Sequence, residues 1–351
     1  MLSQAEIVRY SRQTILPEIG MEGQLKLKTA RVLVIGVGGL GCPVLQYLAA
    51  AGVGTIGIVD YDKVEESNLQ RQILYTSGDV GKYKAEIAKE KATSLNPFIN
   101  IHAYVMRVTK ENILQLIEPY DIIVDGSDNF STRYLVNDAC VIMHKPFVFG
   151  SIFKFEGQVS VFNYKNGPTY RCIFPELPDA DTTPNCAAIG VVASLPGIVG
   201  TYQANETIKM ITGTGEVLSG RLLIIDALHM HMQSFCFSVI EENKAITHLG
   251  DYEYDFCSDV STIQLEELQQ LLTTEKIQLV DVREPEEHAV FNIGGMNIPL
   301  EQLATNEELL TINQTIILYC TTGVRSKKAV GILEGRGLKN VLSLHDGIKH
   351  L

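Results

Sequence analysis

The feature that most constrains the fold is an alternation of strand-like and helix-like segments around a glycine-rich turn. The run RVLVIGV at 31–37 has the continuous apolar character of a strand buried on both faces, and a helical segment follows at about 41–51. Gly36, Gly38 and Gly41 fit the pattern G-x-G-x-x-G, which brings main-chain N–H groups and a positive helix end against a phosphate. A parallel α/β fold with a nucleotide site at this turn is therefore predicted.

The same alternation continues through the first part of the chain. Further strands are predicted at 55–60, 99–108 and 120–128, and further helices at 84–95 and 131–143. Period-two alternation at 146–164, with a bend at Gly157, and a strand pair at 220–237 predict antiparallel strands that extend the sheet. A loop rich in Pro, Asp and Thr at 175–186 enters an apolar helix that ends near Gly213. The predicted fold class is α/β, a Rossmann-like and mainly parallel sheet extended by antiparallel strands.

The last third of the chain reads as a separate domain. Residues 241–260 lose the periodicity and gain acidic charge, after which short strand and helix signals alternate again. We therefore predict an N-terminal domain at 1–240, a linker at 241–260 and a small α/β domain at 261–351.

Composition excludes several classes of function. The chain has 41 acidic and 29 basic residues and no basic run, so a nucleic-acid partner is not expected. The first 20 residues lack an apolar signal core and no apolar run is long enough to span a membrane, which predicts a cytoplasmic protein. Seven scattered cysteines without a CxxC pair indicate neither a disulfide framework nor a Cys-rich zinc site. Any functional cysteine is expected to act alone.

Polar side chains follow the second strand in greater number than a dinucleotide site requires. Asp60 closes that strand and is placed to accept a hydrogen bond from a ribose hydroxyl. The glycine pattern alone also fits NAD, FAD or a purely structural turn around Gly39. Many donors in one place suit a triphosphate under attack better than a pyrophosphate, and here they are Asn68, Arg71, Gln72, Lys82 and Lys84. The loop is therefore predicted to bind ATP.

Two carboxylates lie at the end of the strand predicted at 120–128. Asp125 and Asp128 come at its carboxyl end, where open α/β sheets bind ligands and where a carboxylate can hold Mg²⁺ that bridges phosphates. Asp and Asn are also common as turn residues after a strand, so this signal alone leaves both readings open.

Together these motifs resemble the ubiquitin-activating superfamily. Within it they are similar to the bacterial adenylyltransferases that activate the ubiquitin-like sulfur carriers of molybdopterin and thiamine synthesis. The resemblance covers about residues 5–240 and rests on RYSRQ (9–13), GVGGLGCP (36–43), VDYDKVEESNLQRQ (59–72), GKYKAE (81–86) and DGSDNF (125–130). It implies ATP and Mg²⁺ as cofactors and the C-terminal glycine of a carrier as the adenylated group.

The resemblance also implies roles for single residues. Asp60 would hold the ribose, Asn68 would orient the phosphates, Arg71 and Lys84 would neutralise them, and Asp128 would carry Mg²⁺. Catalysis of this kind is mostly positioning and charge neutralisation, so no general base is nominated. The nucleotide-binding set is Gly36, Gly38, Gly39, Gly41, Asp60, Asp62, Asn68, Arg71, Gln72, Lys84, Asp128 and Asn129.

Arg12 adds an expectation about assembly. In the family an N-terminal arginine reaches the γ-phosphate from the neighbouring subunit, and Arg12 in RYSRQ matches it. A homodimer is therefore implied.

Two cysteines could take the step after adenylation. Cys186 in PNCAAIGVV is expected where the loop enters the apolar helix, and matching family loops carry a cysteine there. A thiol at a helix N-terminus has a lowered pKa, although a buried structural cysteine is the alternative. Cys186 would receive the acyl group or relay the attack.

A second family resemblance involves Cys320. The segments QLVDVREPEEH (278–288), NIPL (297–300) and CTTGVRS (320–326) resemble single-domain rhodaneses, with Cys320 opening a loop before a helix at Ser326. Inward N–H groups, Arg325 and a helix N-terminus would stabilise a thiolate or persulfide anion. A phosphatase loop is disfavoured because Arg325 follows Cys320 one residue too early.

The chain also departs from its relatives. Many of them bind zinc through two CxxC pairs, whereas PTYRC keeps only Cys172, with Thr169 in the place of its partner. One cysteine cannot build a tetrahedral thiolate site, so no structural zinc is expected. In the rhodanese-like segment, Asn292 stands where a histidine is common.

These observations predict an adenylyltransferase with sulfurtransferase activity, in which a Cys320 persulfide converts the adenylated carrier to a thiocarboxylate. The sulfur donor is either a persulfide-generating desulfurase or thiosulfate, and the carrier serves molybdopterin, thiamine or another pathway. One alternative is an adenylating enzyme for a different peptide or protein modifier. Another is an NAD-binding oxidoreductase with a rhodanese-like interaction module.

Overall fold

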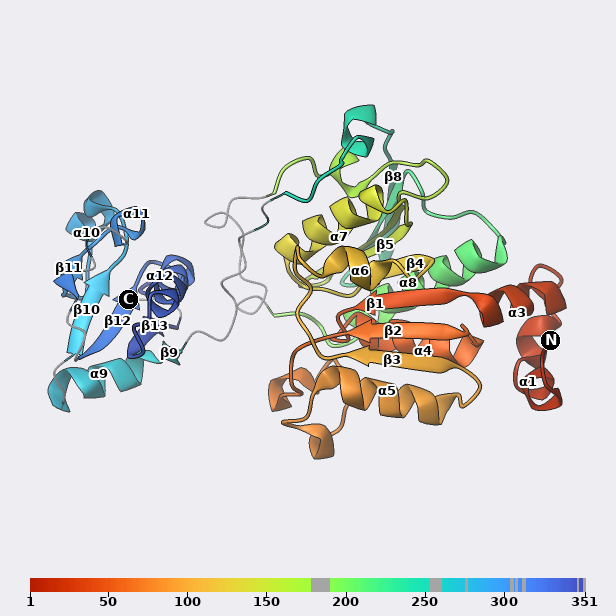
Figure 1. Cartoon of the computed structure of the whole chain (residues 1–351), viewed down its shortest axis with the longest axis horizontal. Helices are drawn as coiled ribbons and strands as arrows, with labels where there is room; N and C mark the ends of the chain where they lie inside the picture. Colours follow the sequence, from red (N-terminus) through yellow and green to blue (C-terminus); the bar gives the residue numbers. More distant parts are fainter. Residues whose placement is uncertain are drawn as a thin grey trace. The chain divides into compact units, whose positions relative to one another are not determined.

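The computed structural model describes residues 1–177, 190–250, 252, 261–274, 277–303, 306, 309–310, 314–345 and 347–349. The chain divides into two compact units, the first ending at Tyr252 and the second containing the described residues from 261 onward (Figure 1). Tyr252 is buried, and its hydroxyl donates to Asp138 Oδ2 at 2.6 Å. The described residues from 241 to 252, which composition assigned to a linker, therefore belong to the first unit.

Helices and strands alternate through most of the first unit. Its elements are α1 (Gln4–Arg9), α2 (Ser11–Thr14), α3 (Gly20–Thr29), β1 (Arg31–Ile35), α4 (Gly41–Ala51), β2 (Thr55–Val59), α5 (Lys84–Leu95), β3 (Asn100–Tyr104), α6 (Ile113–Ile117), β4 (Ile122–Asp125), α7 (Phe130–Ile142), β5 (Phe147–Phe153), β6 (Glu156–Phe162), α8 (Leu195–Thr212), β7 (Arg221–Asp226) and β8 (His231–Cys236).

One eight-stranded sheet organises this unit, in the order β3-β2-β1-β4-β5-β6-β7-β8. The strands from β3 to β5 are parallel, and β6, β7 and β8 continue the sheet in antiparallel register. The predicted Rossmann-like sheet with an antiparallel extension is confirmed. Because parallel strands end at the same edge, the loops after β1, β2 and β4 lie at one side of the sheet.

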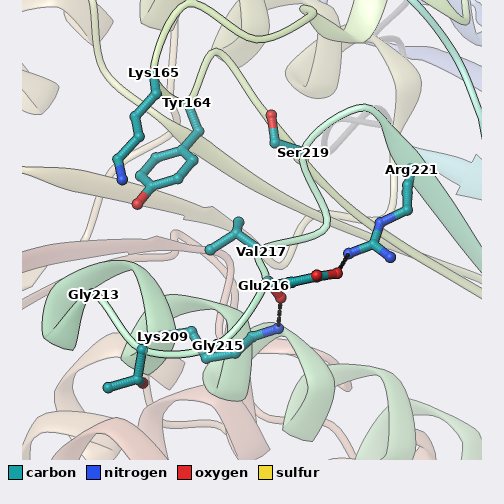
Figure 2. A pocket seen from close by; sticks show the side chains of 10 residues that line it. Tyr164, Lys165, Lys209, Gly213, Gly215, Glu216, Val217, Ser219 and Arg221 are labelled. Atoms are coloured by element: carbon teal, nitrogen blue, oxygen red, sulfur yellow. Dashed lines mark hydrogen bonds and ion pairs between the residues drawn. The ribbon is translucent and has the colours of Figure 1, made fainter. Parts of the chain in front are cut away.

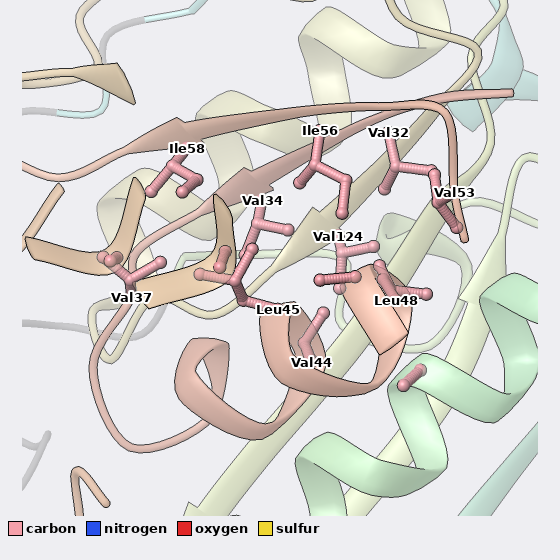
Figure 3. Close-up of a cluster of buried hydrophobic side chains, with 14 of the residues drawn as sticks. Val32, Val34, Val37, Val44, Leu45, Leu48, Val53, Ile56, Ile58 and Val124 are labelled. Atoms are coloured by element: carbon pink, nitrogen blue, oxygen red, sulfur yellow. The ribbon is translucent and has the colours of Figure 1, made fainter. Parts of the chain in front are cut away.

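Both faces of the parallel part are covered by helices. Alternate side chains of β1 enter different layers: Val32 and Val34 pack with α4, α5 and α8, whereas Leu33 and Ile35 pack with α6 and α7. Figure 3 shows the first layer, with Leu45 and Leu48 of α4 against the strands. Each fully buried Val, Leu or Ile side chain contributes about 1.5–3 kcal/mol, so this packing fixes the strand edge that carries the site.

The bend predicted at Gly157 lies elsewhere. The β5–β6 turn is at Lys154 and Phe155, where Lys154 has φ +53°, and Gly157 is paired within β6 opposite Ile152. A Cβ at position 157 would lie 2.4 Å from Cγ2 of Val199, so this glycine allows α8 to pack closely on the strand.

The second unit is a smaller parallel α/β domain. Its sheet has the order β11-β10-β12-β13-β9, and hydrophobic clusters lie on both faces. Its elements are β9 (Thr262–Ile263), α9 (Leu265–Thr274), β10 (Ile277–Asp281), α10 (Pro285–Val290), β11 (Met296–Asn297), α11 (Leu300–Leu303), β12 (Thr315–Tyr319), α12 (Val324–Gly335) and β13 (Val341–Leu344). The predicted small C-terminal α/β fold is confirmed.

Candidate functional site

The glycine loop after β1 is held by close main-chain contacts. Gly36 has φ +81°, and a Cβ there would lie 2.9 Å from the carbonyl oxygen of Gly126. A Cβ at Gly41 would lie 2.0 Å from the carbonyl oxygen of Gly36. Any side chain at these two positions would force the backbone apart, so the loop shape depends on glycine.

The other two glycines of the loop lie beside predicted polar residues and beside α8. A Cβ at Gly38 would lie 3.5 Å from Nε2 of Gln72, and one at Gly39 would lie 3.1 Å from Cβ of Pro196 and 3.8 Å from Cγ of Arg71. Gln72 Oε1 is buried and accepts no hydrogen bond from the described residues. A buried acceptor without a donor costs about 1–3 kcal/mol, so this place fits a ligand that brings a donor. The structure thus brings the glycine loop, Arg71 and Gln72 together.

Asp60 lies beside the loop at the end of β2. Its Oδ2 accepts from the Val37 N–H at 2.9 Å, and its Oδ1 accepts from the Asp62 N–H at 2.8 Å. Burial raises the pKa of Asp60, and the positive charge of Lys84 opposes that rise. Each carboxylate oxygen can accept more than one hydrogen bond, so capacity remains for a ribose hydroxyl.

Lys84 is the first residue of α5, and its side chain is buried. Its Nζ lies 2.9 Å from Oδ2 of Asp62, a half-exposed carboxylate. Asp62 was predicted in the nucleotide-binding set, and its contact in the structure is with this lysine. An incoming phosphate would share Lys84 with Asp62 or displace it.

The two carboxylates after β4 have different surroundings. Asp125 is fully buried, and its Oδ2 lies 3.2 Å from Nε of Arg133. Asp128 is exposed, whereas Asn129 caps α7 by accepting from the Thr132 N–H at 2.7 Å. Mg²⁺ in phosphate sites commonly takes one or two protein carboxylates, with phosphates and waters completing its shell. Asp128 suits that role better than Asp125, and the side-chain oxygen of Asn129 already accepts one hydrogen bond in the cap.

No group of three or more His, Cys, Asp or Glu residues gathers around a possible metal position in the ranges that the structure describes.

Tyr75 was not predicted, yet it ties the loop to the lysine helix. Its hydroxyl donates to the carbonyl of Val37 at 2.9 Å and lies 3.4 Å from the carbonyl of Lys84. The sequence around it, QILYTSG, shows no pattern that would have revealed this contact. Only the fold brings these three residues together.

Arg12 lies away from the glycine loop of its own chain. It is an exposed residue of α2, and the neighbouring Gln13 donates to the carbonyl of Ala51 at the carboxyl end of α4. The glycine loop is at the opposite end of this 11-residue helix, about 16 Å away along its axis. Figure 1 shows the N-terminal helices beside the starting ends of the strands.

Cys186 lies outside the described residues. The helix it was expected to begin starts only at Leu195, and the residues before it are not helical: Val192 N–H donates to the carbonyl of Lys154 at 3.2 Å. The described part of this helix thus begins later than predicted, because residues 190–194 include a contact with the β5–β6 turn, and the role of Cys186 stays a prediction.

Cys320 begins a tight loop between β12 and α12. The residue is 1% exposed, and its Sγ accepts from the Ser326 N–H at 3.4 Å. Gly323 has φ +83°, and a Cβ there would lie 2.3 Å from the carbonyl oxygen of His345. The helix begins at Val324, two residues earlier than predicted, so the amide that reaches the sulfur belongs to its first turn.

Arg325 forms a two-point contact with a residue that the sequence analysis left without a role. Its Nη1 and Nη2 lie 2.6 and 2.7 Å from the two carboxylate oxygens of Glu287 in α10. The Ser326 amide donates to the sulfur, and the stabilisation of the thiolate by Arg325 stays a prediction. Glu287 lies in the quoted run REPEEH, but its partner is too distant in sequence to have been inferred.

These two sites match two known sequence families. The ThiF family matches residues 10–245, and the rhodanese-like domain matches residues 264–350. The chain belongs to the ThiF family. The predicted resemblance to this type of adenylyltransferase, with a rhodanese-like domain after it, is confirmed.

Two of three relatives of this ThiF-family chain carry both activities in their names, and the third carries the first activity alone. A probable adenylyltransferase/sulfurtransferase, MoeZ, of Mycobacterium tuberculosis is 45% identical, over 99% of this chain and 93% of its own length. The adenylyltransferase and sulfurtransferase MOCS3 of Aedes aegypti is 42% identical, over 94% and 82%. A sulfur carrier protein adenylyltransferase of Thermus thermophilus is 52% identical, over 70% of this chain and 92% of its own. The predicted enzyme class agrees with these names.

A solved structure of similar fold is that of E. coli MccB with AMPCPP and MccA. It is 26% identical and has a TM-score of 0.59, with 66% of this chain and 72% of that chain covered. MccB with MccA-N7isoASN, at 24% identity and a TM-score of 0.61, covers 71% and 76% and supports the fold of the first unit.

Cys172 of the ThiF-family chain is surrounded by hydrogen-bond donors. Its Sγ lies 3.3 Å from the Ile240 amide nitrogen, 3.5 Å from Oγ1 of Thr169 and 4.0 Å from Nδ2 of Asn243. These contacts join the segment at 169–172 to the one at 240–243. The hydrogen bonds of Cys172 thus link these two segments. The absence of structural zinc stays a prediction.

A cavity of about 340 Å³ lies at the carboxyl end of α8, apart from the predicted residues (Figure 2). Lys209 Nζ lies 2.5 Å from the Glu216 carbonyl, and Arg221 Nη2 lies 3.1 Å from Oε2 of Glu216. The lining charges are thus partly compensated, and the cavity shares no residue with the nucleotide or cysteine loop.

None of the helices in the described ranges combines the length and the apolar character that crossing a bilayer requires.

Proposed function

We propose that this ThiF-family chain acts in the cytoplasm as a homodimer, adenylating the C-terminal glycine of a ubiquitin-like sulfur carrier and converting it to a thiocarboxylate. The observation that carries the proposal is the presence of two sites in one chain: a glycine loop with Asp60, Arg71 and Lys84, and a buried cysteine in a rhodanese-like loop. Names of the relatives that pair both activities support it.

In the first step the chain binds ATP and holds it for attack. The ribose is bound by Asp60, the phosphates by the N–H groups of the glycine loop, and their charge is offset by Arg71 and Lys84. Asp128 would hold Mg²⁺, which when bound offsets further phosphate charge. The carrier carboxylate then attacks the α-phosphorus, the bond to the bridging oxygen breaks, and pyrophosphate leaves with the electron pair. Positioning and charge neutralisation suffice, so no side chain needs to remove a proton.

The position of Arg12 supports the proposed homodimer. Since α2 packs at the end of α4 remote from the glycine loop, Arg12 cannot serve the site of its own chain without unpacking. An exposed arginine at this position can reach the phosphates of a second copy, as the family resemblance implies.

In the second step Cys320 supplies sulfur. A persulfide on Cys320, stabilised by the Ser326 amide, attacks the carrier acyl adenylate, and AMP leaves. A second thiolate then attacks Sγ of Cys320, a disulfide forms between the two thiols, and the carrier thiocarboxylate leaves with the electron pair of the broken S–S bond. A thiol reductant then returns both cysteines to the reduced state for the next turnover. Cys186 is proposed for this relay or as the acyl acceptor.

Mass spectrometry of candidate carriers tests the proposal. Carriers of the molybdopterin and thiamine pathways are incubated separately with the full chain, ATP, Mg²⁺ and a sulfur donor, and compared with Cys320→Ala and Asp128→Ala. We expect one oxygen of the carrier to be replaced by sulfur with the native chain. We expect adenylate without sulfur with Cys320→Ala, and no modification with Asp128→Ala or with EDTA.

Two outcomes would contradict the proposal. Adenylation that is equal with and without Cys320, and never followed by sulfur, would favour an adenylating enzyme for another modifier. NAD binding without pyrophosphate release would favour the oxidoreductase.

A further inference from the structure

The Cys320 loop carries an ion pair that compensates its arginine. Glu287 accepts two parallel hydrogen bonds from Arg325, at 2.6 and 2.7 Å, and Thr321 Oγ1, next to Cys320, donates to the same carboxylate at 3.3 Å. Two-point pairing of this kind is the strongest arrangement available to a guanidinium and also fixes its plane. The guanidinium of Arg325, which lies at the end of the cysteine loop, is therefore already paired before a sulfur donor arrives.

The carboxylate is charged throughout the neutral range. Its hydrogen bonds with Arg325 lower the pKa of Glu287 to about 2. The side chains of Glu287 and Arg325 are 36% and 22% exposed, so a small solute can meet them from solvent. A dianion that approaches Cys320 must either accept the repulsion of Glu287 or displace it from Arg325.

Glu287 repels a thiol persulfide less than it repels thiosulfate. Its reacting group is neutral or carries one charge, so it needs no guanidinium, whereas thiosulfate carries two negative charges on five atoms. A site can discriminate between two donors by repelling one of them, without any added attraction for the other.

We propose that Glu287 is a specificity-determining residue that, by occupying Arg325, disfavours thiosulfate and leaves thiol persulfides as the sulfur donors of the Cys320 loop. This inference rests on the sulfur-transfer step of the proposed function. The Cys320 thiolate attacks the outer sulfur of R–S–SH, a new S–S bond forms on Cys320, the original S–S bond breaks, and its electron pair leaves with R–S⁻. The same displacement on thiosulfate would release sulfite, and neither reaction needs an external oxidant or reductant.

Donor selectivity in the full chain tests this assignment. Persulfide formation on Cys320 is followed by intact-protein mass spectrometry with thiosulfate, with glutathione persulfide, and with a cysteine desulfurase supplied with L-cysteine. Glu287→Gln removes the competing charge, and Glu286→Gln is the matched control, since it removes the same charge from an exposed neighbour on α10. We expect Glu287→Gln to raise kcat/KM for thiosulfate about tenfold, which corresponds to about 1.4 kcal/mol, without a comparable rise for either persulfide. Glu286→Gln should leave the donor preference unchanged.

The outcomes separate this inference from the proposed function. Equal thiosulfate use by the native chain and Glu287→Gln, an equal gain in Glu286→Gln, or a parallel loss with all donors in Glu287→Gln would overturn the role of Glu287. Persulfide loading from only one of the two persulfide sources supports the proposal and identifies a small thiol or a protein as the donor. If no donor loads Cys320 of the native chain while ATP–pyrophosphate exchange proceeds, the sulfur-transfer step of the proposed function fails instead.

Discussion

The glycine loop of the first unit and the cysteine loop of the second share a backbone arrangement but hold positive charge differently. Each loop follows a parallel strand and leads into a helix, and each needs a glycine with positive φ, Gly36 at +81° and Gly323 at +83°. Each also places main-chain carbonyls where a Cβ would collide. The backbone geometry alone therefore does not distinguish a phosphate site from a sulfur site.

The difference lies in the side chains around the loops. Lys84 has one contact with the half-exposed Asp62, and Arg71 donates to the carbonyl of Ser67 at 3.1 Å, so an incoming polyanion can compete for both cations. Arg325 is instead bound at two points by Glu287. A site for a triphosphate keeps its cations weakly partnered, whereas a site for a single sulfur atom uses a main-chain amide and compensates its arginine.

The largest expected effect is that of a substitution of Cys320, which should abolish sulfur transfer and leave adenylation intact. Cys320→Ser should abolish thiocarboxylate formation and leave ATP–pyrophosphate exchange within about twofold of the native rate, because the sulfur is not part of the adenylation site. Both activities are measured on the same preparation. Loss of exchange in this variant would mean that the two loops do not work independently.

A substitution beside the glycine loop should have an effect nearly as large, on adenylation instead of sulfur transfer. Lys84→Met should slow carrier adenylation about 10²–10³-fold, since it removes a buried cation from the developing phosphate charge. Persulfide loading of Cys320 should not change. Asp62→Asn is the informative companion variant, because Lys84 loses its partner but keeps its charge, and adenylation at saturating ATP should then fall far less than in Lys84→Met.

A matched pair of glycine variants compares the backbones. Gly41→Ala and Gly323→Ala each place a Cβ within 2.0–2.3 Å of a carbonyl oxygen, and each should lower the free energy of unfolding of its own unit by about 1–3 kcal/mol. Differential scanning calorimetry should show a different transition shifted in each variant. A shift of both transitions by either variant would contradict independent unfolding of the units.

The smallest expected effect concerns acid stability of the second unit. Arg325 lowers the pKa of Glu287 from 4.5 to about 2, so the pair stabilises the folded state above about pH 4.5 and loses that contribution as the pH falls toward 2. Because the pair is partly exposed, Glu287→Gln should cost only about 0.5 kcal/mol at pH 7. Urea unfolding at pH 7, 4 and 3 should show the difference between native chain and variant shrinking with acid; a constant difference would contradict the pairing.

Much of the fold could be predicted because its signals are local. The helices at 41–51 and 84–95 are bounded in the structure as in the prediction, since apolar periodicity and the glycine turn define them within a few residues. The errors arose where a residue distant in the sequence determines the local structure. The segment before Leu195 is apolar enough for a helix but bonds to Lys154, and Gly157 serves the packing of α8 instead of a bend.

The sequence by itself determined the order of strands and helices, the glycine loop, Asp60 at the end of its strand, the ThiF-type motifs and the cysteine loop, because each depends on residues close together in the chain. Only the tertiary structure decided that Asp62 pairs with Lys84, that Tyr75 joins the loop to that lysine, and that Glu287 occupies Arg325. Such contacts join residues 9 to 38 positions apart, and their partners are selected by how the elements pack. The chemistry of each loop was therefore visible in the sequence, and the balance of charge around it was not.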